Sequence, residues 1–476
     1  MLEWHAQHNR GKVMAFDEYF DINLYLIQNT SEIKEIQLQK LRKHLTKFYA
    51  QSPLVKMFID SQGLKPEKMT LDGFRKAFPL LGQETLRGSM PSESSKKPGF
   101  VVKMMSDMLG IAPDKYVLMC ATSGTTGEPT PYFFTAEDLE HMPRGTCRGL
   151  YMVTKGDKEE IRTMRAVQAF GLSMFGAGVP LVECLIRLGV ACIPVGAEAG
   201  TDRILKFSDR FAATCIWCTP SLAEYMVDTA LDRIRAIKFK QVFCGAEPGA
   251  GIPEVRKKIE EGFQSKLYDG MGLIGGLTLF SCDQEEYAGM HHLTDDMFLF
   301  ELVDPETKEM IPWEDQAVGE LVMSPLQGYS IPPGRFSSGD VGQIFLSPCP
   351  CGEPGWRIKM RGRSDDMLKV KGVIVYPAAV DGVITGFVPR VTGEFRIVLD
   401  APPPRVEPPL KVKIEYGEGL KEEELAALSK EIEGEMHAKL KVRPSITWVP
   451  PMTLERATHK TKFIEKTYEK KHTAVE

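Results

Sequence analysis

A short segment rich in hydroxyl groups and glycine, residues 122–130, has the composition of a phosphate-binding loop. It follows the apolar run 116–121, which is typical of a buried strand. Glycines let backbone N–H groups turn towards an anion with no Cβ in the way, and hydroxyl groups add donors. No Gly-Lys-Ser/Thr sequence closes the segment, so it is not a Walker-type loop, and a plain surface turn is the alternative. The candidate anion-binding residues are Ser123, Gly124, Thr125, Thr126 and Gly127.

Other segments carry groups that suit a nucleotide. Residues 245–248, Gly-Ala-Glu-Pro, follow an apolar run, where backbone is suited to border a planar ring. Asp340 ends the segment Arg-Phe-Ser-Ser-Gly-Asp, and an ionised carboxylate has the two acceptors that vicinal ribose hydroxyls need. Residues 362–372 place Arg363 among acidic side chains, and Lys460 lies in a basic stretch near the C-terminus. The candidates in the first of these segments are Ala246, Glu247 and Pro248.

A second constellation has the ligand types of a metal site. Cys349 and Cys351 lie two residues apart, and Cys282 and His291 lie together on an earlier segment. Three thiolates and one imidazole complete a closed tetrahedral set of the structural kind. His292 is an alternative ligand, and four unconnected loop residues are the other interpretation.

Size, charge and cysteine use restrict the class of protein. The chain has 476 residues, so two or more domains are expected. A net charge of -5 means that the chain lacks the overall excess of positive charge that is typical of proteins binding nucleic acid or an anionic membrane. The first residues lack an apolar signal core, and no long uncharged apolar run follows, which predicts a cytoplasmic protein. Ten cysteines in such a chain indicate reduced thiols or metal ligands.

The pattern of apolar and polar residues along the sequence changes once, near residue 361. Residues 19–80 have helical periodicity, and from 112 to 350 short apolar runs alternate with amphipathic stretches, which predicts α/β layers around a largely parallel sheet. After residues 361–366 we expect strands at 394–399, 410–416 and 445–449 and a helix with Leu425 to Leu440 on one face. The predicted domains are 1–361 and a small α+β domain, 362–476.

The nucleotide segments, taken in order, resemble the adenylate-forming superfamily of acyl-CoA synthetases, and more closely its phenylacetate-CoA ligase branch. The resemblance spans residues 100–465 and includes Ser-Gly-Thr-Thr-Gly-x-Pro-Thr at 123–130 and Gly-Arg-x-Asp-Asp at 362–366. It implies a large adenylation domain, a mobile C-terminal domain, and ATP, Mg²⁺ and coenzyme A as cofactors. The Cys and His set is similar to a zinc site of some relatives. A homodimer is left open.

The resemblance also implies roles for single residues. The segment 122–130 would hold the β- and γ-phosphates, and Lys460 would bridge the carboxylate and the α-phosphate, with Lys462 as a competing candidate. Asp340 would bind the ribose and Arg363 the ribose or a phosphate. Asp365 matches the hinge about which the small domain rotates, bringing residues 369–372, including Gly372, into the site for thioester formation.

One departure from the family concerns magnesium. The family usually carries Tyr-Gly-x-Ser/Thr-Glu, whose glutamate holds the ion, whereas this chain has Tyr-Asp-Gly-Met-Gly-Leu-Ile-Gly-Gly at 268–276. Gly272 falls where the glutamate is expected. Asp269, or coordination by the phosphates alone, would then serve, and loss of catalysis is the alternative.

The acyl group is expected between an aromatic wall and the glycines of residues 270–276. Aromatic and glycine lining favours a planar apolar acid, such as a benzoate, naphthoate or phenylacetate, and ordinary core packing is the alternative. Two rival functions remain open, a deazaflavin-adenylating synthetase that needs no coenzyme A and a nucleotide-binding protein without catalysis. The candidate acyl-binding residues are Phe170, Met174, Phe175, Gly270, Gly272 and Gly275.

Overall fold

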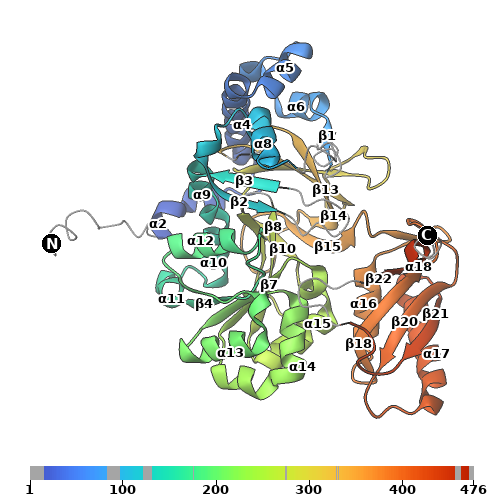
Figure 1. The fold of residues 1–476 in the computed structure, drawn as a ribbon. Coiled ribbons are helices and arrows are strands. Elements are labelled where there is room, and N and C mark those ends of the chain that lie inside the picture. Colours follow the sequence, from blue (N-terminus) through green and yellow to red (C-terminus); the bar gives the residue numbers. More distant parts are fainter. Residues whose placement is uncertain are drawn as a thin grey trace.

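The computed structural model describes residues 16–82, 97–121, 131–174, 176–273, 276–328, 330, 332–455 and 463–470. A large α/β body forms most of the molecule, and residues after about 366 form a smaller body beside it (Figure 1). The predicted fold class is confirmed. Among the described residues, no helix is long and apolar enough to cross a membrane.

The large body is built on one twisted sheet whose first half is parallel. Its strands are β5 (Ala191–Pro194), β4 (Arg165–Gln168), β6 (Cys215–Cys218), β7 (Gln241–Gly245) and β8 (Lys266–Leu273), adjacent in that order. These are short apolar runs because both faces are covered, as is usual for parallel sheets. The crossover helices are α12 (Val179–Arg187), α13 (Thr201–Arg210), α14 (Pro220–Ile237) and α15 (Pro253–Phe263).

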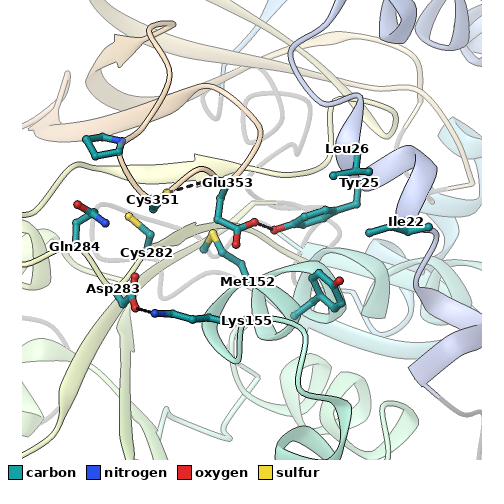
Figure 2. A pocket seen from close by; sticks show the side chains of 12 residues that line it. Ile22, Tyr25, Leu26, Met152, Lys155, Cys282, Asp283, Gln284, Cys351 and Glu353 are labelled. Carbon is teal, nitrogen blue, oxygen red and sulfur yellow. Dashed lines mark hydrogen bonds and ion pairs between the residues drawn. The ribbon is translucent and has the colours of Figure 1, made fainter.

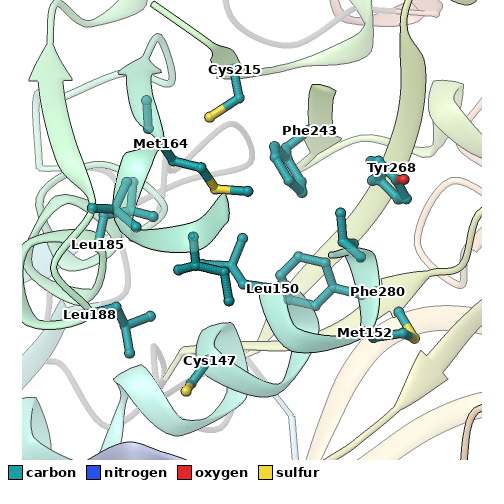
Figure 3. Packing of buried hydrophobic residues seen from close by; sticks show 14 of the residues in the cluster. Cys147, Leu150, Met152, Met164, Leu185, Leu188, Cys215, Phe243, Tyr268 and Phe280 are labelled. Carbon is teal, nitrogen blue, oxygen red and sulfur yellow. The ribbon is translucent and has the colours of Figure 1, made fainter. Parts of the chain in front are cut away.

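Each face of this half-sheet has its own apolar core. Phe243, Tyr268 and Phe280 pack with Leu150 of α10 (Pro143–Val153) on one face, as Figure 3 shows. Gly149 is needed there, because a Cβ at this position would lie 2.1 Å from the Phe280 ring. The other face packs under α13, α14 and α15.

The second half of the sheet is mostly antiparallel, so the prediction of a largely parallel sheet is wrong for this half. This half carries the later site residues. It continues from β8 through β9 (Gly276–Ser281), β10 (Met290–His292), β15 (Arg357–Arg363), β14 (Arg335–Phe345), β13 (Val318–Pro325), β11 (Phe298–Val303) and β12 (Met310–Ile311). The short β1 (Leu80–Leu81) pairs with β14. A separate hairpin consists of β2 (Tyr116–Ala121) and β3 (Pro131–Thr135), followed by α9 (Ala136–His141) and, after α10, by α11 (Lys158–Thr163).

The N-terminal region is helical, as its periodicity predicts. Its main elements are α2 (Phe16–Tyr19), α3 (Ile22–Leu26), α4 (Ser31–Gln51), α5 (Pro53–Ser61), α6 (Leu71–Ala77) and α8 (Phe100–Leu109). Leu41, Leu45 and Phe48 of α4 are buried against Phe74 of α6 and Leu109 of α8. This layer packs outside the sheet (Figure 1).

The smaller body has its own core and sheets. The strands β16 (Leu368–Val370), β17 (Val373–Val375) and β19 (Arg405–Val406) form one sheet, and β21 (Pro444–Val449), β20 (Leu410–Tyr416), β18 (Val391–Leu399) and β22 (Ile464–Lys466) form another. The helices are α16 (Pro377–Thr385), α17 (Glu422–Leu440) and α18 (Thr467–Lys470). Three strands and one helix therefore lie where the sequence predicts them, and Leu428, Ile432 and Met436 are buried on the predicted helix face.

Candidate functional site

The carboxyl ends of β7 and β8 meet where the sequence places the nucleotide. Gly245 ends β7 so close to β8 that a Cβ there would lie 2.3 Å from the carbonyl oxygen of Gly270. The ring of Phe170 lies 4.0 Å from the same Cβ position. Any larger residue at position 245 would push the strands apart. Gly245, Gly270 and Phe170 thus lie close together and buried at this edge of the sheet, the edge at which ligands bind in open α/β folds.

The turn after β7 has an unusual backbone. Ala246 adopts a left-handed conformation with φ of 70°, which is strained for a residue with a side chain. The Glu247 carboxylate accepts a hydrogen bond of 2.7 Å from the backbone N–H of Ser221, at the start of α14. Pro248 then begins a short 3-10 turn, Pro248–Gly251. The turn is therefore fixed on both sides, and its backbone borders the strand ends.

The acyl-wall candidates lie beside the end of β2. Phe170 is buried, whereas Met174 is 57% exposed. The carbonyl oxygen of Met174 accepts a 2.9 Å hydrogen bond from the backbone N–H of Ala121, which immediately precedes the predicted phosphate loop. Several predicted residues lie outside the described residues, and their roles stay predictions: Ser123, Gly124, Thr125, Thr126, Gly127, Phe175, Gly275 and Lys460.

Asp269 is a buried carboxylate with its own partner. It is 5% exposed, and it accepts a 2.6 Å hydrogen bond from the hydroxyl of Tyr287. Burial raises the pKa of Asp269 to about 6, although Tyr287, Arg256 and the N–H of Gly270 oppose the shift. These contacts fit a structural carboxylate better than a ligand for an exchangeable cation. The position of Gly272 is exposed, and a Cβ there would have 3.6 Å of clearance to the carbonyl oxygen of Gly276.

Asp340, Arg363 and Asp365 are brought together at the junction between the two bodies. β14 and β15 pair Asp340 directly with Arg363, and the guanidinium donates to Asp340 Oδ1 at 3.1 Å. It also donates to both oxygens of Asp365, at 2.8 and 3.2 Å. These two carboxylates raise the pKa of Arg363 further despite its burial. The charge of the partly buried Asp340 is therefore balanced by Arg363.

The hairpin of β16 and β17, which contains residues 369–372, is held against the large body. Lys369 in β16 pairs with Glu306, which lies in the turn between β11 and β12. Gly372 forms the turn between β16 and β17 with φ of 85°, a conformation that glycine adopts without strain.

Cys282, His291, Cys349 and Cys351 form one cluster, as the sequence predicts. One ligand atom from each residue lies within 4.8 Å of all the others. Cys282 Sγ lies 3.9 Å from Cys349 Sγ, and Cys351 Sγ lies 3.4 Å from His291 Nε2. His291 Nδ1 lies 2.9 Å from the carbonyl oxygen of Pro354, so the opposite ring nitrogen faces the cysteines. Three cysteines and one histidine, with the Pro354 carbonyl oxygen orienting the imidazole ring, fit a tetrahedral zinc ion.

The alternative ligand His292 is committed elsewhere. Its Nδ1 lies 2.9 Å from Asp295 Oδ1, and its Nε2 lies 2.9 Å from the Thr294 hydroxyl. Both ring nitrogens are therefore occupied, and the histidine is fully buried. His291 is the histidine of the cluster.

A cavity of about 440 Å³ borders this cluster, and no sequence pattern indicated it. Figure 2 shows Cys282 and Cys351 on one wall and Tyr25 and Leu26 of α3 on another. The Tyr25 hydroxyl donates to Glu353, whose backbone N–H donates to Cys351 Sγ at 3.4 Å. The N-terminal helix is thus linked to the cluster through one carboxylate. The only sequence signal was that Glu353 lies two residues after a candidate ligand.

Carboxylates face each other where α16 packs on the large body. Asp381 of α16 is surrounded by Glu224 of α14 and by Glu247, with Glu394 on its own side. Lys258 of α15 pairs with Glu224 at 3.5 Å and with Asp228 at 2.9 Å. Desolvation is the largest cause that raises the pKa of Asp381, and it raises the pKa of Glu224 to about 7.

This interface is expected to weaken as the pH rises. Carboxyl groups with a raised pKa stabilise the packed state below their usual pKa, and that contribution is lost as the pH passes the raised value. Small-angle scattering at pH 6 and pH 8 should show expansion of the native protein at the higher pH, and Asp381→Asn should remove most of that change. Glu418→Gln, an exposed site in the same body, serves as the control. Equal expansion of the native protein and Asp381→Asn would contradict this account.

Comparison with known proteins agrees with this geometry. Residues 372–466 match the AMP-binding enzyme C-terminal domain. The chain is 26% identical to phenylacetate-coenzyme A ligase of Thermus thermophilus, over 88% of this chain and 93% of that one. It is 24% identical to the enzyme of that name from Aromatoleum evansii, over 90% and 92% of the two chains.

The fold is also similar to that of solved structures. A 2-hydroxyisobutyryl-CoA ligase in its postadenylation state superimposes with a TM-score of 0.78 at 21% identity, covering 95% of this chain and 93% of that one. The same ligase in its thioesterification state, at 21% identity with 95% and 94% covered, gives 0.61. The chain is therefore similar in sequence to phenylacetate-coenzyme A ligases over most of its length, and it shares the fold of a CoA ligase.

Proposed function

We propose that this protein is an ATP-dependent aryl-carboxylate CoA ligase that works through an acyl-adenylate. Its similarity to curated phenylacetate-coenzyme A ligases over most of its length supports an AMP-forming acid–thiol ligase. The main support for the nucleotide site is the junction at Asp340, where β14 and β15 join the ribose-binding candidate to Arg363 and the hinge candidate Asp365. The strand ends at Gly245 and Gly270 supply the neighbouring surface for the adenine and acyl groups.

In the first step, the substrate carboxylate attacks the α-phosphorus of ATP and pyrophosphate leaves. Two anions approach each other, so the site must supply positive charge and N–H donors where charge develops. We assign this work to Lys460 and to the loop at 122–130. Asp340 would hold the ribose hydroxyls and so fix the α-phosphate in line with the acid. Magnesium would be held mainly by the phosphates, since Asp269 is committed to Tyr287.

The proposed acyl group is planar and aromatic. Gly245 and Gly270 have no side chains where their strands lie close together, and the ring of Phe170 lies beside them. The absence of a side chain at Gly272 widens the same edge. A flat ring fills such a slot with little loss of conformational entropy, whereas a branched or flexible chain fills it poorly.

In the second step, the thiol of coenzyme A attacks the acyl carbonyl carbon and AMP leaves. We propose that the small body rotates about Asp365 between the two steps, removing Lys460 and bringing in residues 369–372. The higher TM-score against the postadenylation state supports an arrangement near the first step, with Lys369 held by Glu306. We further assign structural zinc to the Cys282 cluster.

Lys460→Ala is expected to separate the two steps. Acyl-AMP formation should fall by about 10²- to 10³-fold, as when one preorganised donor to the transition state is lost. Thioester formation from supplied acyl-AMP should stay within about twofold, because the lysine has left the site by then. Lys462→Ala is the matched control from the same basic stretch. Equal loss in both half-reactions would contradict the proposed division of work, and loss in Lys462→Ala alone would move the role to that residue.

A panel of carboxylic acids tests the proposed function. Pyrophosphate release is measured with benzoate, naphthoate, phenylacetate and aliphatic acids, with and without coenzyme A, and products are identified by mass spectrometry. We expect release that depends on an aromatic acid and an aryl-CoA product that depends on the thiol. AMP joined to a deazaflavin, or no release with any acid, would overturn the proposal in favour of a nucleotidyltransferase or a non-catalytic relative.

A further inference from the structure

The segment that carries candidate acyl-binding residues is held in place by side chains that have no role in the proposed reaction. We call residues 170–174 and 176–178 the acyl loop; it joins β4 to α12. It has no regular secondary structure, yet its backbone is hydrogen-bonded at several separate places, and three of these attachments carry the inference. A loop without secondary structure needs such partners for its polar groups to keep one conformation.

The first attachment is Gln168, the last residue of β4. Its side chain is fully buried, and Nε2 donates to the carbonyl oxygens of Ala177 at 3.0 Å and Gly178 at 3.4 Å. In the opposite amide orientation, Oε1 would face two carbonyl oxygens, and none of these three atoms can donate a hydrogen bond. Nε2 is therefore the atom that faces them. Gln168 therefore holds the end of the acyl loop next to α12.

The second attachment is Glu198, in the short turn after β5. One carboxylate oxygen accepts a 3.0 Å hydrogen bond from the backbone N–H of Ser173. Partial burial works against ionisation, but backbone donors at Glu198, Ser173 and Leu172 together lower the pKa of this carboxyl. The attachment is thus charged at neutral pH, and charged acceptors make the stronger hydrogen bonds.

The third attachment joins the acyl loop to the strand that precedes the predicted phosphate loop. The carbonyl oxygen of Met174 accepts from the N–H of Ala121, at the end of β2. Met174 has φ of 64°, a left-handed conformation that is unfavourable for a residue with a side chain. Such a residue keeps its conformation only where the surroundings determine it. Gln168 and Glu198 determine it here, one on each side.

We propose that Gln168 and Glu198 are positioning residues that make the acyl loop a rigid connection between the acid and the phosphates of ATP. The inference rests on the proposed function for its two ligands. Ordering of the loop by one ligand prepares Met174 and Ala121 for the other, so acid and nucleotide bind cooperatively. Coupling of this kind is reciprocal, and about 5- to 20-fold is expected for one shared loop.

Hydrogen–deuterium exchange of the full-length protein tests the connection itself. Gln168→Leu removes the amide at nearly constant volume. Its matched control is Gln241→Leu, which has the same change in a buried glutamine of β7 whose Nε2 donates to Glu160. We expect about 10-fold faster exchange at residues 116–121 and 172–178 in Gln168→Leu and no change there in Gln241→Leu. Unchanged exchange in both variants would overturn the proposal, whatever reaction the protein performs.

Ligands then separate positioning from general stability. With Mg·ATP added, the native protein should be protected at residues 116–121 and also at 172–178, whereas Gln168→Leu should be protected at 116–121 alone. Glu198→Ala, at an exposed residue, should act in the same direction if Gln168→Leu folds poorly, and Glu198→Gln should restore the native pattern because an acceptor remains.

Kinetics provide the corresponding readout for substrates. Saturating acid should lower the KM for ATP about 5- to 20-fold in the native enzyme and less than about twofold in Gln168→Leu. Equal coupling in both proteins would contradict the proposal. If no acid supports turnover, the proposed function fails, and the exchange experiment without ligands still decides whether the loop is connected as described.

Discussion

On the proposed zinc assignment, Cys351→Ser should yield a protein that binds no zinc and unfolds at a markedly lower temperature than the native protein. The four ligand atoms converge from β9, β10 and the turn before β15, segments that no other covalent or metal link would join. Metal binding by a set that exists only in the folded state contributes its free energy to folding, on the order of 10 kcal/mol in small zinc domains. Even a fraction of that amount is large beside the usual net stability of a domain.

The cluster also supports the contact between α3 and the sheet. Glu353 accepts from Tyr25 and donates its backbone N–H to Cys351, so loss of the metal should loosen the N-terminal helix. Proteolysis near residues 16–30 should therefore speed up in Cys351→Ser. Thermal unfolding with metal analysis measures the main effect.

The control for this variant is Cys192→Ser, a partly exposed cysteine outside the cluster. It should keep one equivalent of zinc and lose little stability. A strong chelator should destabilise the native protein and the control, and it should leave Cys351→Ser unchanged. A native protein that is free of metal and equally stable would contradict the assignment.

Asp340→Asn is expected to lower kcat/KM for ATP about 10²-fold or more. Two hydroxyl donors on an ionised acceptor contribute about 1.5–3 kcal/mol each, and the amide retains one neutral acceptor. The substitution also leaves Arg363 with Asp365 alone, which should favour a guanidinium turned away from the ribose. Asp202→Asn, the same change at a side chain 95% exposed on α13, is the control.

A second nucleotide identifies the contact. If Asp340 holds the ribose, the native enzyme should discriminate strongly against 2′-deoxy-ATP, and Asp340→Asn should discriminate much less. The loss of kcat/KM caused by Asp340→Asn and the loss caused by removing the 2′-hydroxyl would then be non-additive, as is usual for groups in contact. Full additivity would place the carboxylate away from the ribose and would contradict its assigned role.

The fold was predictable where local patterns coincide with burial. The strand β20 and the helix α17 appear where alternation and helical spacing predict them, because each buries one apolar face in a shared core. The four-residue metal cluster was predictable for another reason. Few chemistries other than metal binding explain soft ligands in pairs, although only the structure shows that His291 and not His292 faces them.

The contacts between distant segments were not predictable from local patterns. Gln168 and Glu198 carry no motif, and their roles depend on where the acyl loop lies after folding. Asp381 is an ordinary helix residue until α16 packs against Glu224 and Glu247. Asp269 was considered for magnesium from its position alone, and its hydrogen bond with Tyr287 argues for a structural role instead.

The most direct test of the central claim follows an oxygen atom. An aromatic acid labelled with ¹⁸O in its carboxylate is converted in the presence of Mg·ATP and coenzyme A, and the AMP is analysed by mass spectrometry. If the carboxylate attacks the α-phosphorus, its oxygen becomes the bridge of the acyl-adenylate and stays on phosphorus when the thiol displaces AMP. We predict one labelled oxygen in each AMP. Unlabelled AMP, or label in inorganic phosphate beside ADP, would contradict carboxylate adenylation.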